Sequence, residues 1–177
     1  MSPAEWSQVT ERVVIQAAAA HPHDVVLDVG AGLGSLSRAL APHVKRVVAF
    51  GARDEVERPL PENIEVQIGT LVSPPCAGVS VVVMNDTLSR LVPSDQARLI
   101  AHLGRSLPDR ALLVIGDVLW SIPQNDIDEP EQFGTDVRNA RTIAAVETEL
   151  RAAGFLPDAH RFGVGRAVLI CLKAARG

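Results

Sequence analysis

The chain has 177 residues, of which 47% are hydrophobic, and this size and composition predict one well-cored domain spanning residues 1–177 rather than two domains or a disordered chain. The net charge is −4 and the sequence pI is near 5.7. With no basic run, 3% aromatic residues and no tyrosine, the chain has little with which to track phosphates or stack on bases, so we expect no nucleic-acid partner.

The termini and the cysteines indicate a cytoplasmic setting. Two cysteines, Cys76 and Cys171, are too few for a disulfide framework. The first residues include Glu5 and Glu11 and lack the basic segment of a secretory signal, and no apolar run is long enough to cross a membrane. We therefore expect a cytoplasmic protein with no membrane partner.

In chain order, the first half predicts strands separated by short or broken connections. A helix is predicted over 3–20, with Trp6, Val9, Val13 and Ala17 as its apolar stripe, and segment 1–24 is a candidate lid. His21 and His23 follow without a carboxylate or thiolate cluster, so we expect no metal site. Strands are predicted at 25–29, 46–50, 64–68 and 79–84; a glycine turn and a helix, with Leu33, Leu36 and Leu40 at helical spacing, follow the first strand.

The second half predicts longer elements. It begins with a loop over 85–92 and a helix from Pro93 to about Ser106, followed by a strand over 111–116. Segment 117–135, with Pro123 and Pro130, is expected to form an irregular lid. A helix over 136–153 ending at Gly154, and a hairpin of strands 155–162 and 167–173, complete the chain.

The first strand leads into a distinctive glycine turn. Asp28, Gly30, Gly32 and Gly34 give the pattern D-x-G-x-G-x-G between a buried strand and a helix. Glycines allow a tight turn and the close approach of a ligand, and a helix start presents unpaired N–H groups. A dinucleotide-binding fold would need its third glycine at the position of Ser35. The pattern instead resembles the first motif of the class I S-adenosylmethionine (SAM)-dependent methyltransferases.

Further segments extend the resemblance over about residues 25–173. The phrase RSLPDRALLVIGD at 105–117 is similar to the family's passage into the fifth strand, and RAAGF at 151–155 is similar to its lead into the terminal hairpin. The resemblance implies an α/β fold: a three-layer, doubly wound, mostly parallel sheet of seven strands, with an antiparallel C-terminal hairpin strand. Alternating strands and helices favour the same architecture.

The resemblance also implies a SAM site at the carboxyl ends of the strands, where doubly wound sheets bind ligands. Asp28 and the glycine turn would face the amino-acid end of SAM, Thr70 and Leu71 the adenine, and Asn85 the methionine portion. The complete expected set of cofactor-binding residues is Asp28, Gly30, Ala31, Gly32, Gly34, Gly51, Thr70, Leu71 and Asn85.

Two positions depart from the family pattern. The acid that ends the second strand and holds the ribose is Gly51 here, and an aspartate often found after the third strand is Thr70. Asp54 and Glu55 follow three and four residues after Gly51 and can replace the missing acid only if their loop folds back. Without a replacement, a lost charge-assisted contact costs about 1.5–3 kcal/mol of binding free energy.

No catalytic residue is assigned. Asp86 and Asp117 are candidates for a base or a substrate contact, since both are predicted at carboxyl ends of strands, and capping a loop or helix is the competing role for each. Methyl transfer depends mainly on alignment and water exclusion, so no fixed triad is needed. The segment Met84–Thr87 lacks the N-P-P-aromatic motif of base methyltransferases, which disfavours DNA amino methylation.

The sequence thus favours a SAM-dependent methyltransferase acting on a small-molecule acceptor between the N-terminal helix and segment 117–135, with a homodimer left open. The competing hypotheses are a non-catalytic relative that serves as an interaction or dimerisation module, a member that binds SAM without transferring the methyl group, and an NADP-type enzyme. In the last of these, Arg53 would meet the 2′-phosphate.

Overall fold

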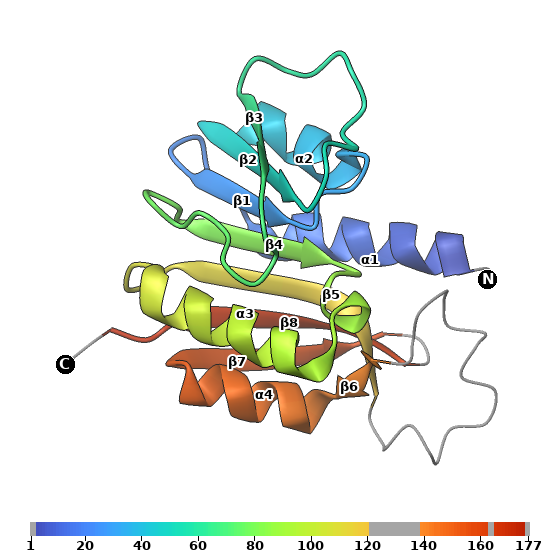
Figure 1. Ribbon diagram of the computed structural model, residues 1–177, viewed down its shortest axis with the longest axis vertical. Coiled ribbons are helices and arrows are strands. Elements are labelled where there is room, and N and C mark those ends of the chain that lie inside the picture. Colours follow the sequence, from blue (N-terminus) through green and yellow to red (C-terminus); the bar gives the residue numbers. More distant parts are fainter. Residues whose placement is uncertain (1–2, 121–138, 163–164, 176–177) are drawn as a thin grey trace.

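The chain folds into one mixed sheet with helices on both faces (Figure 1). The computed structural model describes residues 3–120, 139–162 and 165–175. The strands are β1 (Val25–Val29), β2 (Arg46–Gly51), β3 (Ile64–Ile68), β4 (Val81–Asn85), β5 (Leu112–Trp120), β6 (Arg141–Thr142), β7 (Phe155–Arg161) and β8 (Arg166–Lys173). The helices are α1 (Pro3–Ala18), α2 (Ser35–Leu40), α3 (Pro93–Ser106) and α4 (Ile143–Ala152), with single 3-10 turns η1 (Ala41–His43) and η2 (Leu88–Arg90).

The strand order is β3-β2-β1-β4-β5-β8-β7. Strands β1 to β5 pair in parallel, and β8 is antiparallel to both β5 and β7. This confirms the doubly wound, mostly parallel sheet with an antiparallel C-terminal hairpin. An eighth, two-residue strand that was not predicted, β6, pairs in parallel with the far end of β5. The order reverses between β1 and β4, which places a ligand site beside the carboxyl end of β1.

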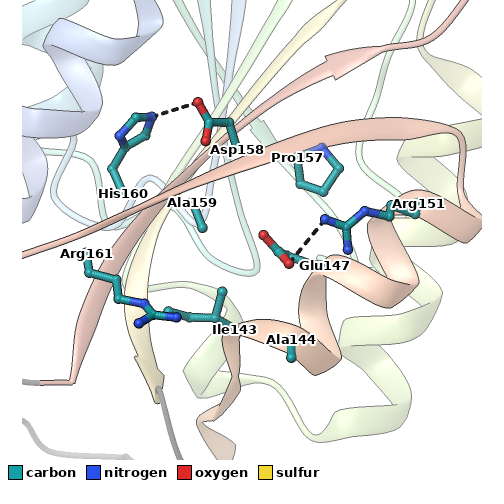
Figure 2. Close-up of a pocket in the computed structure, with 9 residues that line it drawn as sticks. All are labelled: Ile143, Ala144, Glu147, Arg151, Pro157, Asp158, Ala159, His160 and Arg161. Carbon is teal, nitrogen blue, oxygen red and sulfur yellow. Dashed lines mark hydrogen bonds and ion pairs between the residues drawn. The ribbon is translucent and has the colours of Figure 1, made fainter.

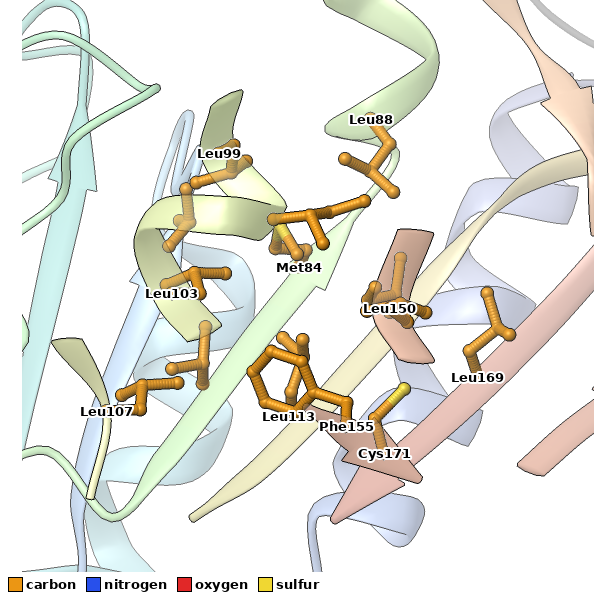
Figure 3. Packing of buried hydrophobic residues seen from close by; sticks show 14 of the residues in the cluster. Met84, Leu88, Leu99, Leu103, Leu107, Leu113, Leu150, Phe155, Leu169 and Cys171 are labelled. Atoms are coloured by element: carbon orange, nitrogen blue, oxygen red, sulfur yellow. The ribbon is translucent and has the colours of Figure 1, made fainter. Parts of the chain in front are cut away.

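Each face of the sheet has its own apolar core. Helices α3 and α4 cover one face, where Leu103, Leu113, Leu150 and Phe155 pack together (Figure 3). Helices α1 and α2 cover the other face, with Val14 among the side chains of that core. The valine-rich strands β1, β2 and β4 contribute to both cores, which is why they read as continuous apolar runs in the sequence.

Helix α1 turns a different face to the sheet from the one predicted. The fully buried positions are Thr10, Val14 and Ala18, while Val9 and Val13 are only partly buried. A threonine is tolerated in the buried row because its hydroxyl donates a hydrogen bond to the Trp6 carbonyl at 2.8 Å and accepts one from Arg166. The predicted stripe of Val9, Val13 and Ala17 therefore lies one residue before the buried row of Thr10, Val14 and Ala18.

The segments around the predicted second lid also differ. Strand β5 continues to Trp120, so Asp117 lies inside a buried strand rather than in a lid; the remainder of that segment, residues 121–135, is outside the described residues. The helix predicted over 136–153 begins only at Ile143, because Arg141 and Thr142 form β6 and the Thr142 hydroxyl caps the helix by accepting from the Ala145 N–H at 3.2 Å. Residues 136–138 of that prediction are also outside the described part.

Candidate functional site

The glycine turn follows β1 and is held against the end of β2. The N–H groups of Gly30 and Ala31 both donate to the Phe50 carbonyl, at 2.8 and 3.1 Å. Gly30 has φ +82°, and a Cβ there would lie 2.5 Å from the Thr87 hydroxyl, so only glycine lets the turn sit this close to the end of β4. Leu33, predicted as part of an apolar helical stripe, precedes α2 and is 60% exposed.

Asp28 lies beneath this turn. Its side chain is 2% exposed and accepts a 2.6 Å hydrogen bond from the Ser37 hydroxyl of α2. Burial raises the pKa of Asp28 to about 7, and the nearby charge of Glu11 adds to the increase. The carboxyl group therefore changes its charge near neutral pH, and a cationic group bound above it would favour the ionised form.

A cavity opens over the carboxyl ends of the parallel strands. It has two adjoining parts of about 350 and 300 Å³, and each lies within the usual range of about 300–1,000 Å³ for ligand pockets. The residues that line both parts are Gly30, Gly32, Glu55, Asp86 and Arg90. The two parts therefore meet over the glycine turn and form one continuous surface.

Most of the residues predicted to bind the cofactor border this cavity. The first part is lined by Asp28, Gly30, Ala31, Gly32 and Asn85, together with Ser7 and Glu11 from α1. The second part is lined by Gly51, Ala52, Arg53, Leu71 and Thr87. Two predicted residues are not among the lining residues: Thr70, and Gly34, which lies beneath Val56.

The loop after β2 folds back over the glycine turn. Val56 is buried, with its Cγ1 2.6 Å from where a Cβ on Gly34 would be, and the Glu57 N–H donates to the Leu33 carbonyl at 3.2 Å. This brings Glu55 to both parts of the cavity. The neighbouring Asp54 is instead paired with Arg58 at 3.0 Å. The loop thus folds back as a replacement for the missing acid at Gly51 requires, and it brings Glu55, not Asp54, to the cavity.

Asp86, just after β4, is held in a buried network. It has φ +51°, a left-handed conformation that is rare for a residue with a side chain and is often found at functional sites. One carboxylate oxygen accepts from Arg166 of β8 at 2.6 Å, and the other accepts from the Ser7 hydroxyl at 2.5 Å. Arg166 also donates to the Thr10 hydroxyl at 3.1 Å, so the network ties α1 to the cavity wall.

Asp117 is placed away from the cavity and acts as a cap. It is fully buried and accepts hydrogen bonds from the N–H groups of Leu88 at 2.7 Å and Val118 at 2.7 Å, with a longer one from Ser89. Burial raises its pKa to about 6, and the charge of Asp86 adds to the increase. Because Asp117 borders neither part of the cavity, the geometry favours its capping role over a substrate contact.

The side-chain oxygen of Asn85 is buried at the end of β4 and has no hydrogen-bond partner within the described part of the chain. Asn85 also lines the first part of the cavity. A buried acceptor without a partner costs about 1–3 kcal/mol. A ligand donor, such as an ammonium group, would satisfy it.

A larger hollow of about 700 Å³ lies elsewhere, between α4 and the edge strand β7 (Figure 2). Two pairs of its charged side chains lie within ion-pair distance: Arg151 with Glu147 at 3.2 Å, and His160 with Asp158 at 3.1 Å. Arg151, His160 and Asp158 are exposed and Glu147 is half-buried, and pairs so close to solvent contribute little binding energy. This hollow lacks the strand ends and the glycine turn, so its volume does not make it the preferred site.

A family described as "Methyltransferase domain" matches residues 3–155, which is most of the chain. The chain belongs to this methyltransferase domain family. SAM is the cofactor of the family, in agreement with the resemblance seen in the glycine motif.

Individual relatives agree with this assignment. The chain is 29% identical over 161 residues to a carboxy-S-adenosyl-L-methionine synthase of Pseudomonas fluorescens, covering 79% of this chain and 62% of that protein. It is 44% identical over 55 residues to ribosomal RNA small subunit methyltransferase A of Thermobifida fusca, covering 31% of this chain and 19% of that protein. The methyltransferase domain thus spans less than two thirds of the length of either protein.

Among solved structures, a Burkholderia thailandensis 1,6-didemethyltoxoflavin-N1-methyltransferase with bound S-adenosylhomocysteine has the same fold. The TM-score is 0.70 at 20% identity, and the match covers 96% of this methyltransferase domain and 79% of that chain.

The residues present fit SAM. Beyond its two chain neighbours, only the Gly30 carbonyl, at 3.9 Å, lies within 4 Å of the place where a Cβ on Gly32 would be, so the turn leaves its ligand side open. The acids around the cavity and the buried Asn85 oxygen suit a ligand that carries an ammonium group and a sulfonium. Within the described ranges, no helix is long and apolar enough to cross a membrane, and no three His, Cys, Asp or Glu side chains are grouped to hold a metal ion.

Sequence reasoning missed several residues that shape this cavity. Arg90, Ser7 and Glu11 were not assigned to the site, and Arg166 was not singled out at all. Arg166 reaches Asp86 from 80 positions along the chain, so no local spacing marks the pair. Glu55 was named only as a condition on the loop, because its sequence neighbours do not show that Val56 packs on the glycine turn.

Proposed function

We propose that this chain is a SAM-dependent methyltransferase that acts on a small-molecule acceptor. The observation that carries the proposal is the open side of the glycine turn, over which both parts of the cavity meet. The cavity is compact, the charged lining residues of its first part are four acids and Arg90, and the chain has no basic run for a nucleic acid. The 1,6-didemethyltoxoflavin-N1-methyltransferase, whose fold is similar, acts on a small molecule by name.

In this proposal the first part of the cavity holds the methionine portion of SAM, and the second part holds the ribose and the adenine. Asp28 and the Asn85 oxygen accept hydrogen bonds from the ammonium of the methionine portion, and the Gly32 N–H, unlike those of Gly30 and Ala31, is left to face its carboxylate. Glu55 accepts from the ribose hydroxyls, and Leu71 packs against the adenine. Gly34, packed against Val56, supports the turn from beneath, and Thr70 is given no direct contact with the cofactor. When bound, SAM supplies a methyl group activated by a positively charged sulfur.

The chain's own contribution is alignment and exclusion of water. Asp86 is clamped by Ser7 and Arg166, so it is better suited to holding the end of β4 and α1 in place than to removing a proton. Helix α1 borders the first part of the cavity through Ser7 and Glu11, which is the role expected of a covering element. Positioning of this kind accounts for a large part of the barrier reduction in displacement reactions.

Calorimetric titration with SAM and with S-adenosylhomocysteine tests the proposal. We expect micromolar binding of both, and the variant Glu55→Gln should weaken both by about ten- to a hundredfold, because it removes about 1.5–3 kcal/mol of charge-assisted hydrogen bonding. Asp54→Asn is the matched control: its carboxylate is paired with Arg58 outside the cavity, so affinity should stay within about twofold.

Two other results would redirect the proposal. Binding of neither compound at millimolar concentration would contradict it and favour a non-catalytic module. Tight binding without formation of S-adenosylhomocysteine in the presence of a panel of small carboxylic acids, phenols and amines would favour a protein that binds SAM without transferring the methyl group.

A further inference from the structure

Arg90 lies where the two parts of the cavity meet. It ends η2, directly after the loop that follows β4, and its exposed side chain borders both parts of the cavity. Hydrogen bonds hold the backbone there: the Asp117 carboxylate accepts from the N–H groups of Leu88 and Ser89, and the Arg90 N–H donates to the Thr87 carbonyl at 3.3 Å. The side chain of Arg90 therefore reaches the cavity from a backbone turn that hydrogen bonds hold in place.

The charge of Arg90 is not used within the described fold. No ion pair among the described residues involves it, although six other arginines pair with carboxylates: Arg46, Arg58, Arg98, Arg141, Arg151 and Arg166. Asp86, which borders both parts of the cavity with Arg90, already has its charge met by Arg166. A positive charge beside a site for a cationic sulfonium is unfavourable unless an anion lies close to both.

Among the described lining residues, no carboxylate is left over to remove a proton from the acceptor once Glu55 holds the ribose. The described titratable lining residues of the cavity are Glu11, Asp28, Glu55, Asp86, Arg53 and Arg90, with no His, Cys, Lys or Tyr among them. Asp28, Asp86 and Glu11 each already accept a hydrogen bond from a serine. An acceptor that arrives as an anion needs no base.

An apolar surface lies on the same rim. Leu33 lines the first part of the cavity and is 60% exposed. Burying such a side chain against an apolar group of a ligand is favourable by about 25 cal/mol per Å². In the first part of the cavity, Arg90 thus offers a cation and Leu33 an exposed apolar contact to whatever lies next to the cofactor.

We infer that the methyl acceptor is a small amphipathic organic anion, a carboxylate or an ionised acidic hydroxyl, whose charge is held by Arg90 and whose apolar part lies against Leu33. This inference rests on the proposed function. An oxygen lone pair of the anion forms the bond to the methyl carbon, while the carbon–sulfur bond breaks and its electron pair goes to sulfur. The products are a neutral methyl ester or ether and a neutral thioether, and no proton is released.

Linked binding tests the inference without requiring turnover. Titrations of SAM and of S-adenosylhomocysteine are compared in the presence of benzoate or of benzamide, which has a similar shape and no charge. In the wild-type protein benzoate should raise the affinity for SAM by about fivefold or more, because the anion then lies between Arg90 and the sulfonium. Benzoate should raise the affinity for the uncharged thioether much less, and benzamide should affect neither.

The variants separate Arg90 from general charge effects. Arg90→Gln should lose the benzoate effect, while Arg53→Gln, which removes the same charge from the second part of the cavity, should keep it. Equal effects of benzoate and benzamide, an effect that survives Arg90→Gln, or an equal loss in Arg53→Gln would overturn the inference while leaving SAM binding intact. Failure of SAM itself to bind would instead overturn the proposed function. Thermal unfolding of both variants checks that they remain folded.

Discussion

Replacing Gly32 with alanine separates the ligand role of the turn from its structural role. Gly32 has φ +52°, so an alanine there is held in the left-handed region, which costs about 1–2 kcal/mol. The added methyl group meets no protein atom closer than the Gly30 carbonyl oxygen at 3.9 Å. Its steric effect therefore falls on the cavity, which Gly32 lines on both sides.

We expect Gly32→Ala to lower the free energy of unfolding by no more than about 2 kcal/mol, since strain is the main cost. Its affinity for S-adenosylhomocysteine should fall by at least about tenfold, or about 1.4 kcal/mol, because the methyl group occupies space that the ligand needs. The assay is urea unfolding together with calorimetric titration of S-adenosylhomocysteine.

Gly78→Ala is the matched control. Gly78 also has positive φ, +71°, and no atom lies within 4 Å of an added Cβ, but it is not a lining residue of either part of the cavity. It should show a similar loss of stability with unchanged affinity. The reasoning is refuted if Gly32→Ala binds S-adenosylhomocysteine as tightly as the wild type, because the ligand then does not lie against the turn.

Three further predictions concern buried groups. Asp28 has a pKa of about 7 in the folded state and therefore binds its proton more tightly there than in the unfolded chain. Its contribution to the free energy of unfolding is complete below about pH 4 and is lost, by up to about 4 kcal/mol, as the pH rises through 7. Asp28→Asn should flatten this part of the pH profile of stability measured by urea unfolding, and an unchanged slope would contradict the assignment. Arg166→Met leaves the buried Asp86 carboxylate without its cation and should cost about 3–5 kcal/mol of unfolding free energy, whereas a loss below about 1 kcal/mol would show that the pair is not needed. Gly104→Ala places a Cβ 2.4 Å from the Ala153 carbonyl oxygen, so α3 and α4 must separate, and we expect a loss of about 1–3 kcal/mol in thermal unfolding without a change in affinity for SAM.

The sheet could be predicted because its signals are local. Continuous apolar runs mark the central strands, and a glycine stop, confirmed by φ +82° at Gly154, marks the end of α4. The glycine turn was equally readable, since its spacing needs only seven residues. These features depend on neighbours in the sequence and not on what packs against them.

The remaining features depend on contacts between distant segments. The contact face of α1 follows from Arg166, which lets Thr10 be buried. The place of Asp117 follows from the β8 hairpin strand, which pairs with β5 from Leu112 to Val118 and extends it beyond the predicted end. Glu55 reaches the cavity only because Val56 packs against the turn. Such arrangements leave no periodic pattern in the sequence.

A crystal structure of the protein grown with S-adenosylhomocysteine tests the central claim most directly. We predict ligand density over the glycine turn, with the ribose hydroxyls within hydrogen-bond distance of the Glu55 carboxylate and the amino group at the Asn85 side-chain oxygen. Density for the ligand in the hollow between α4 and β7, or a turn closed over by the protein's own side chains at saturating ligand, would contradict the account.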